Sequence, residues 1–215
     1  MMCYNLYVRE RKRTGEGKIT VIFLYSALLL TLAVLISFPY IRVAYRRLMF
    51  IRGLREYCLK EDIRFRLLNK FAFCSSNTNQ DFDFILRVGK TVIPVKFYSA
   101  VHPHSTLIMG RAGKACERRK VRDVLPRTGE AENKTLNYGK SLPRPRIKKA
   151  WIGDRHTCLP VVLNYPQYAS VMTESGDGVI TEADSSTTVS GCRWLSSREF
   201  MSLVRGLNEE VKTGR

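Results

Sequence analysis

The stretch from Ile19 to Ile41 reads ITVIFLYSALLLTLAVLISFPYI and carries no side chain that is charged at neutral pH. A helix rises about 1.5 Å per residue, so about 20 apolar residues are needed to cross the hydrocarbon core of a bilayer. A soluble helix of the same length would have a polar face, and this stretch has none. Its hydroxyl groups can bond back to the helix backbone. The sequence therefore predicts a transmembrane helix over residues 19–41.

Basic residues precede this stretch, which is also a feature of cleaved secretory signals. Three observations favour a retained anchor. The apolar run is longer than the roughly 7–15 apolar residues of a signal peptide, and no small-x-small cleavage site follows it. The segment after it is strongly basic, which opposes translocation. We therefore expect a single-pass membrane protein with an N-terminal anchor.

The orientation of the anchor is less strongly encoded, because both flanks are basic. Five Lys or Arg residues lie before the stretch, and six lie within residues 42–60 after it. Cysteine usage favours one side: the five cysteines beyond the stretch are odd in number and lack the regular spacing of a disulfide framework. We therefore predict a cytosolic C-terminal domain. On that side of the membrane the glycosylation sequon at Asn133 is accidental.

The rest of the chain divides by composition. Residues 1–18 form a short basic tail, which we expect to be without ordered structure, and residues 42–71 form a basic juxtamembrane segment with helical spacing. Residues 72–215 are long enough for one soluble domain, which contains a basic loop at 110–150. We predict an α/β domain with a small mixed sheet, and an α+β arrangement remains open.

The formal net charge of +17 would suit a nucleic-acid-binding protein if it were spread over the domain. The charge is instead concentrated: residues 1–71 and 110–150 each carry a net charge of +9, and the remaining residues are close to neutral. Basic residues beside a membrane span are explained by attraction to anionic lipid, worth about 1 kcal/mol each. We therefore expect the lipid bilayer, and its anionic headgroups, as the first partner. A protein partner remains open, and nucleic acid is not favoured.

The candidate contacts to the membrane surface lie in two clusters. The first is in the juxtamembrane segment and the second in the basic loop, and together they comprise Arg46, Arg47, Arg52, Arg55, Arg118, Arg119 and Lys120. The juxtamembrane segment is either an interfacial amphipathic helix that binds anionic lipid or the first helix of the domain, with its apolar stripe in the core. The basic loop is either a solvated loop without a ligand or a surface for an anionic partner.

The clearest local structure is a β-hairpin over residues 81–98. Two β-rich runs flank Gly89-Lys90, which suits a two-residue primed turn. One face of the hairpin is apolar. Because Pro94 cannot donate a hydrogen bond, we expect its strand at a sheet edge or with the missing donor pointing outward. The turn fixes the register and places these pairs opposite each other: Val88 and Thr91, Leu86 and Ile93, Phe84 and Val95, and Asp83 and Lys96.

Two further elements are predicted towards the C-terminus. The run from Cys158 to Leu163 is a candidate for a buried strand. Ser196 and Glu199 form a capping box that opens the last helix. The apolar face of that helix consists of Phe200, Leu203, Val204 and Leu207.

The pair Asp83 and Lys96 resembles part of the restriction-endonuclease-like nuclease core, in which one strand carries an Asp and the next carries Glu-x-Lys. The resemblance covers residues 45–165 as helix, hairpin, connecting segment and strand. In such nucleases the acidic side chains hold Mg²⁺ and the Lys positions the attacking water. Here Pro94 stands at the Glu position, so the resemblance implies the fold more than the activity. Otherwise the pair is a cross-strand ion pair on a solvated sheet face, worth at most about 1 kcal/mol.

Other groupings that could carry chemistry are weak. His102, His104, His156 and Cys158 are of the residue types that bind zinc, but they lack the paired hooks of structural zinc sites. No glycine-rich segment has the spacing of a phosphate-binding loop. We therefore expect no cofactor.

The sequence predicts a membrane-anchored protein with a cytosolic domain that is non-catalytic and acts in interaction or as an adaptor. The alternatives are a membrane-associated nuclease-like enzyme that uses the acidic and basic pair of the hairpin, or a nucleic-acid-binding protein.

Overall fold

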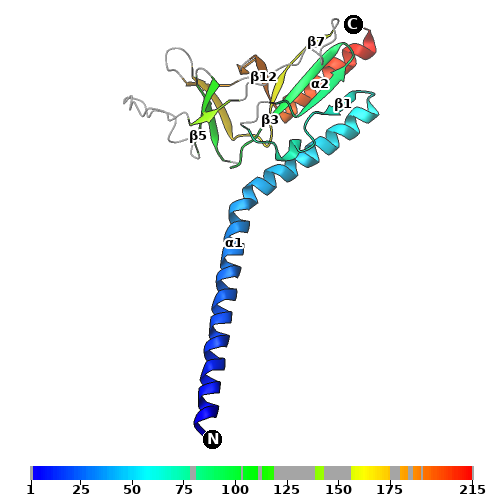
Figure 1. The fold of residues 1–215 in the computed structure, drawn as a ribbon. Coiled ribbons are helices and arrows are strands. Elements are labelled where there is room, and N and C mark those ends of the chain that lie inside the picture. Colours follow the sequence, from blue (N-terminus) through cyan, green and yellow to red (C-terminus); the bar gives the residue numbers. More distant parts are fainter. Residues whose placement is uncertain are drawn as a thin grey trace, which may run out of the picture. The chain divides into compact units, whose positions relative to one another are not determined.

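The computed structural model describes residues 2–77, 81–102, 104–110, 113–118, 139–142, 156–174, 180–183, 186–189 and 191–214. The chain divides into two compact units, Met1–Arg42 and Val43–Arg215. A long apolar helix followed by a mixed-sheet domain with a C-terminal helix confirms the predicted fold class. The elements in chain order are α1 (Met2–Lys60), β1 (Arg64–Leu67), η1 (Ala72–Cys74), β2 (Phe84–Val88), β3 (Thr91–Tyr98), β4 (Thr106–Met109), β5 (Lys114–Arg118), β6 (Lys140–Ser141), β7 (Thr157–Cys158), β8 (Val161–Asn164), β9 (Ser170–Glu174), β10 (Ile180–Glu182), β11 (Thr188–Val189), β12 (Cys192–Ser196) and α2 (Ser197–Thr213) (Figure 1).

Helix α1 contains the predicted transmembrane stretch. Its segment Phe23–Lys60 is long and apolar enough to cross a membrane, and the large apolar side chains between Phe23 and Ile41 are exposed. The helix begins at Met2, so the tail over residues 2–18, where we expected no ordered structure, is helical. Each residue added to an existing helix gains one hydrogen bond, so a helix extends past its apolar part more readily than a new one forms.

The second half of α1 belongs to the domain. Ile51, Leu54 and Cys58 are buried, so the apolar stripe of the juxtamembrane segment belongs to the core. This agrees with the interpretation of the segment as the first helix of the domain. The predicted continuation of helix to residue 71 is wrong. Asp62 has a left-handed φ of 55°, and the residues Arg64–Leu67 that follow it form β1. The alternation of basic and apolar residues in β1 is a strand signal that the helical spacing before it obscured.

Sheet A has seven strands within the described residues. Its order is β1-β2-β3-β8-β12-β11, and β7 also pairs with β3. Strand β2 is antiparallel to both β1 and β3, whereas β3, β8 and β12 run parallel to one another. The hairpin of β2 and β3 has the register that its two-residue turn predicted, with Val88 opposite Thr91, Leu86 opposite Ile93, and Phe84 opposite Val95.

Pro94 lies in the middle of the sheet and not at an edge, because β3 pairs on both sides. Strand β3 pairs with β7 as far as Val92 and with β8 from Val95 onward, so Pro94 lies beside Pro160 in the gap between β7 and β8. The missing donor of Pro94 therefore falls where no strand pairing is made. This is how a central strand accommodates a proline.

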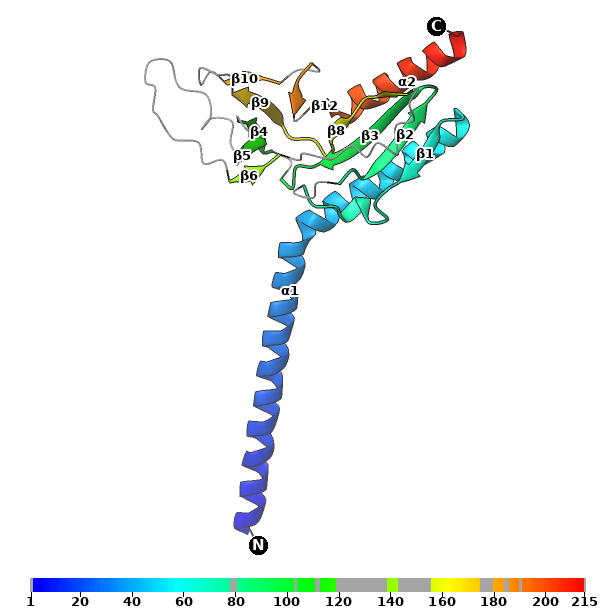
Figure 2. The ribbon, with the colours of Figure 1, turned by 45° about the horizontal axis from the view of Figure 1, so that its top comes forward.

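Both helices pack on one face of sheet A (Figure 2). The rings of Phe50 in α1 and Phe200 in α2 are 6.4 Å apart, and the ring of Phe97 in β3 lies 6.0 Å from that of Phe50. This layer fixes the second half of α1 to the sheet. Its fully or nearly buried members are Ile51, Leu54, Cys58, Phe84, Leu86, Val88, Ile93, Val95, Phe97, Val161, Leu163, Leu195, Phe200 and Val204.

A second sheet packs against the opposite face of sheet A. Sheet B has the order β10-β9-β4-β5-β6, and its strands β5 and β6 lie within the predicted basic loop. Tyr98 and Trp194 of sheet A pack with Leu107 and Met109 of sheet B in a common buried cluster. The domain thus has three layers: the helices, then sheet A, then sheet B. The face of the hairpin that carries Lys96 is the face of sheet A opposite the helices.

Helix α2 begins with the predicted capping box. The hydroxyl of Ser196 accepts the N–H of Glu199 at 3.3 Å, and the carboxylate of Glu199 accepts the N–H of Ser196 at 2.8 Å. At the other end, the carboxylate of Glu61 accepts hydrogen bonds from Asn208 at 2.7 Å and from Lys212 at 2.6 Å. These contacts join the end of α2 to the segment between α1 and β1.

Gly89→Ala is expected to destabilise the domain by about 1–3 kcal/mol. Gly89 has a φ of 55°, and a Cβ at this position would lie 2.5 Å from Cγ2 of Val211 in α2. Denaturant unfolding of the full chain measures the loss. In the control Gly89→Ala/Val211→Ala, the steric clash is gone and the cost of the positive φ stays, so part of the loss should be recovered. Unchanged stability in Gly89→Ala would contradict the close approach of the turn to α2.

Candidate functional site

Asp83 and Lys96 lie side by side, as the register of the hairpin predicted. The ammonium nitrogen of Lys96 is 3.4 Å from both carboxylate oxygens of Asp83. Both side chains are 0% exposed, so the expectation of an ion pair on a solvated sheet face is wrong. The hydroxyl of Ser75, which precedes the hairpin, accepts a hydrogen bond from Lys96 at 2.8 Å. A segment outside the hairpin therefore covers the pair, which the hairpin sequence alone does not reveal.

Asp83 is held by both neighbouring strands. Its Oδ2 accepts the backbone N–H of Phe97 in β3 at 2.8 Å. Its backbone carbonyl accepts the N–H groups of Leu68 at 3.0 Å and of Asn69 at 3.1 Å, just after β1. The carboxylate is thus fixed in position beside Lys96.

Arg47 completes the cluster from α1. It is only 2% exposed, which corrects its assignment as a contact to the membrane surface. Its Nε donates to Oγ of Ser99 at 2.7 Å, its Nη2 donates to Oδ1 of Asn77 at 3.1 Å, and its Nη1 donates to the carbonyl of Ser75. Its guanidinium carbon lies 5.2 Å from the centre of the Phe97 ring. Arg47 thus joins α1 to the end of β3 and to the segment after η1.

Further hydrogen bonds close the cluster. Asn77 donates to the carbonyl of Ser99 at 2.8 Å and accepts the N–H of Ser99 at 2.9 Å. The hydroxyl of Tyr168 also donates to the carbonyl of Ser99, at 3.2 Å, and Oγ of Ser99 donates to the carbonyl of Tyr165. The charged groups are therefore enclosed by neutral polar groups that are themselves paired.

Burial and charge act in opposite directions on the two cations. Burial lowers the pKa of Arg47 to about 10, while the carboxylate of Asp83 acts to raise it. Burial also lowers the pKa of Lys96, again opposed by Asp83, and the charge of Arg47 lowers it further. The cluster contains two cations and one carboxylate, so it carries an excess of positive charge. The exposed carboxylate of Asp81 also acts to raise the pKa of Lys96.

The cluster does not fit the metal site of a restriction-endonuclease-like nuclease. Such a site needs carboxylate oxygens that are free to bind Mg²⁺. Both oxygens of Asp83 face Lys96, and Arg47 adds a second positive charge that repels a divalent cation. Pro94 offers no side-chain oxygen. Within the described residues, no group of three or more His, Cys, Asp or Glu could hold a metal ion.

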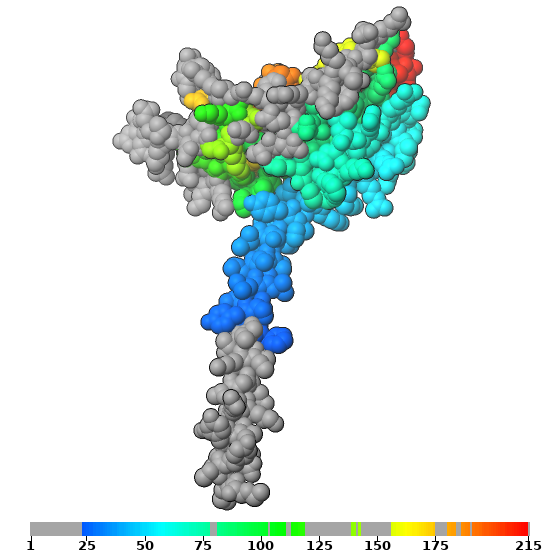
Figure 3. All heavy atoms as spheres, in the orientation of Figure 1, coloured from blue at the N-terminus to red at the C-terminus, as the bar shows by residue number. Residues whose placement is uncertain are grey.

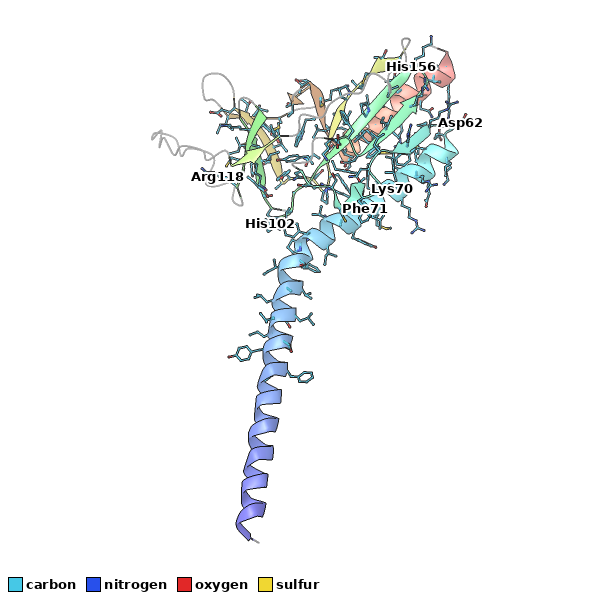
Figure 4. The ribbon with its side chains drawn as sticks, in the orientation of Figure 1. Asp62, Lys70, Phe71, His102, Arg118 and His156 are labelled. Carbon is cyan, nitrogen blue, oxygen red and sulfur yellow. The ribbon has the colours of Figure 1, made fainter. Side chains whose placement is uncertain are left out.

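The four candidate zinc ligands do not converge where the structure describes them. His102 and His156 lie at different ends of the domain, as Figure 4 shows. His104 is exposed, and the ring of His156 contacts the guanidinium of Arg87. Burial raises the pKa of the Cys158 thiol, which disfavours the thiolate that zinc binds.

The other candidate contacts to the membrane surface fall into two groups. Arg46, Arg52 and Arg55 are exposed on α1. Arg46 differs from its neighbour Arg47 because successive residues of a helix point in different directions, so one faces solvent and the other the sheet. Arg118 is half-buried in β5, on the opposite side of sheet A from α1 (Figure 4). Arg119 and Lys120 lie outside the described residues.

Sequence reasoning did not find the neutral members of the cluster, Ser75, Asn77 and Ser99. The polar run from Asn77 to Gln80 indicated only a loop, and no sequence pattern singled out Ser75 or Ser99. Their partner Arg47 lies far from them in the chain, and no local pattern reports such a contact.

No protein family, curated protein or solved structure matches this chain. Its own geometry defines a helix long and apolar enough to cross a membrane, joined to a three-layer domain with a buried ionic cluster.

Proposed function

We propose that this chain is a single-pass membrane protein whose cytosolic domain binds the anionic surface of the same membrane and acts there by binding rather than by catalysis. The observation that carries the proposal is the outer face of α1, directly after the apolar stretch. The part of α1 that follows the apolar stretch lies at the surface (Figure 3). There the apolar side chains Tyr45, Leu48 and Met49 are exposed, as are the arginines 46, 52 and 55. Apolar and basic residues mixed on one exposed helix face are typical of interfacial membrane binding.

Charge supports an anionic surface as the partner. A basic residue near anionic lipid contributes about 1 kcal/mol, so three exposed arginines contribute about 3 kcal/mol. Within the described residues these arginines have one ionic partner, and the contact is weak: Arg52 lies 3.9 Å from Glu56 on the same helix, and both side chains are largely exposed. The arginines are therefore available to phosphate groups.

A cytosolic location is supported by the cysteines. The five cysteines of the described domain are free: Cys58, Cys74, Cys116, Cys158 and Cys192. Burial raises the pKa of Cys58 and of Cys192 to about 11, so these thiols remain protonated. Unpaired thiols in a domain of this size are usual in a reducing compartment.

A non-catalytic role is supported by the buried cluster. Its charged groups are enclosed and hydrogen-bonded to one another and to the backbone, so none is presented to a substrate. A nuclease-like role is one alternative and rests on the juxtaposition of Asp83 and Lys96 alone. A nucleic-acid-binding role is the other and rests on the basic loop at 110–150.

The proposal is tested on the full chain in lipid nanodiscs, with Met49→Trp as a probe on the outer face of α1. Nitroxide groups on the lipid headgroups should quench this tryptophan more strongly in discs that contain phosphatidylserine than in phosphatidylcholine alone. The parent chain, which has the native tryptophans only, gives the background.

Arg46→Gln, Arg52→Gln and Arg55→Gln together should abolish the difference between the two lipids, because the arginines supply the attraction. A matched control removes three exposed cations elsewhere, by Lys90→Gln, Lys114→Gln and Arg198→Gln, and should leave the difference intact. Equal quenching in both kinds of disc, or a difference that survives the loss of the α1 arginines, would overturn the proposal.

A further inference from the structure

Strand β1 ends sheet A and has one free edge. Within the part of the chain that the structure describes, it pairs only with β2, with Arg66 opposite Ile85 and Leu67 opposite Phe84. The N–H of Leu68 donates to the carbonyl of Asp83, so the hydrogen-bonding groups of alternate residues before it also face β2. The backbone N–H and C=O groups of Phe65 and Leu67 therefore point away from the sheet. This edge can accept a further strand.

The side chains of β1 divide by face. The ring of Phe65 packs against the helix layer, 5.6 Å from the ring of Phe84. Alternation along a strand then places Arg64 and Arg66 on the opposite face. Both arginines are exposed, and neither has a hydrogen-bond or ionic partner among the described residues.

A third arginine lies on the same face. Arg87 of β2 stands directly opposite Arg64, and its guanidinium contacts the ring of His156 rather than a carboxylate. Like charges directly opposite each other destabilise a strand pair. One charged side chain would suffice to protect a sheet edge from unwanted pairing. A group of three arginines, with Arg66, that has no carboxylate partner within the described residues therefore points to an acidic ligand.

We propose that β1 is the docking edge for an extended acidic segment of another protein. The segment adds a strand to sheet A, with its backbone bonded to Phe65 and Leu67. Its acidic residues at alternate positions face the arginines of β1 and β2. Its intervening apolar residues lie on the helix side, where Leu67 is 40% exposed. Phe71, four residues beyond the end of β1, is also exposed, at 68%.

Charge excludes a second copy of the chain from this edge. Pairing of two β1 strands would bring the arginines of one copy against those of the other, which adds to the repulsion already present between Arg64 and Arg87. Only a segment of opposite charge relieves it.

The probe is a fluorescein-labelled peptide of alternating Glu and Val residues, added to the full chain in phosphatidylcholine nanodiscs, where no anionic lipid competes. We expect saturable binding by anisotropy, and slowed hydrogen exchange at the amides of Phe65 and Leu67. A matched peptide of alternating Lys and Val should not bind. Binding of both peptides alike, or binding without protection of these two amides, would overturn the proposal.

Two variants separate backbone pairing from charge. Arg64→Gln/Arg66→Gln should weaken binding of the Glu-Val peptide about tenfold and reduce its salt dependence. Leu67→Pro removes an outward N–H without removing a bond to β2, and should also weaken binding. Lys90→Gln/Lys114→Gln is the control with equal loss of charge and should bind as the parent does. Amide protection that depends on protein concentration without peptide would assign the edge to a second copy and overturn the acidic partner.

Discussion

Asp83→Ala is expected to destabilise the domain by about 3–5 kcal/mol, because removing one partner of a buried ion pair leaves an uncompensated charge. The effect should lie at the upper end, since Asp83 is the one buried carboxylate beside two buried cations, Arg47 and Lys96. Denaturant unfolding of the full chain in detergent micelles measures it. The fluorescence of Trp194, which is 4% exposed between the two sheets, reports on the domain alone.

Two further variants show whether the loss comes from buried charge. Asp81→Ala removes an exposed carboxylate two residues away and should change the free energy of unfolding by no more than about 0.5 kcal/mol. Asp83→Ala/Lys96→Met removes one cation together with the carboxylate and should recover part of the loss. A loss below about 1 kcal/mol in Asp83→Ala would instead be the behaviour of a solvated pair.

Leu29→Arg together with Leu32→Arg is expected to prevent membrane insertion of α1. An arginine at the centre of a spanning helix costs about 2.5–3.5 kcal/mol, so the pair costs about 5–7 kcal/mol. Both leucines are exposed in the structure and lie in the apolar stretch. Alkaline carbonate extraction of membranes from cells that produce the chain measures insertion, because an inserted helix resists extraction and a surface-bound protein does not.

The control for this variant places the same side chains in the domain. Leu59→Arg with Val211→Arg changes two apolar residues that are 75% and 50% exposed and lie outside the apolar stretch. This variant should stay in the membrane fraction. Release of the parent chain by carbonate would contradict a spanning helix and leave attachment by the outer face of α1 alone.

The parts of the fold that local rules govern could be predicted from the sequence. The length of the apolar stretch gives the helix, the turn at Gly89 gives the hairpin register, and the capping box at Ser196 gives the start of α2. Each of these depends on residues only a few positions apart.

The parts that depend on distant contacts could not be predicted. The hairpin placed Asp83 opposite Lys96, but their burial depends on Ser75 and on Arg47, which comes from another element. Strand β5 of sheet B was missed because Lys114–Arg118 has three charged and only two apolar residues, and its pairing with β4 supplies the order. Register is a local property, whereas burial is a property of the whole domain.

The pair of prolines at the centre of sheet A separates β7 from β8, the two consecutive strands that run parallel to β3. Pro94 and Pro160 lie beside each other where neither can donate a hydrogen bond, and within the described residues two residues of β7 pair with β3 beyond them. Strand β7 can therefore separate from β3 while β8 stays in place, because β8 is hydrogen-bonded to β3 on one edge and to β12 on the other. We therefore expect local opening of β7 to end at the two prolines and to leave the hydrophobic layer between sheet A and the two helices intact.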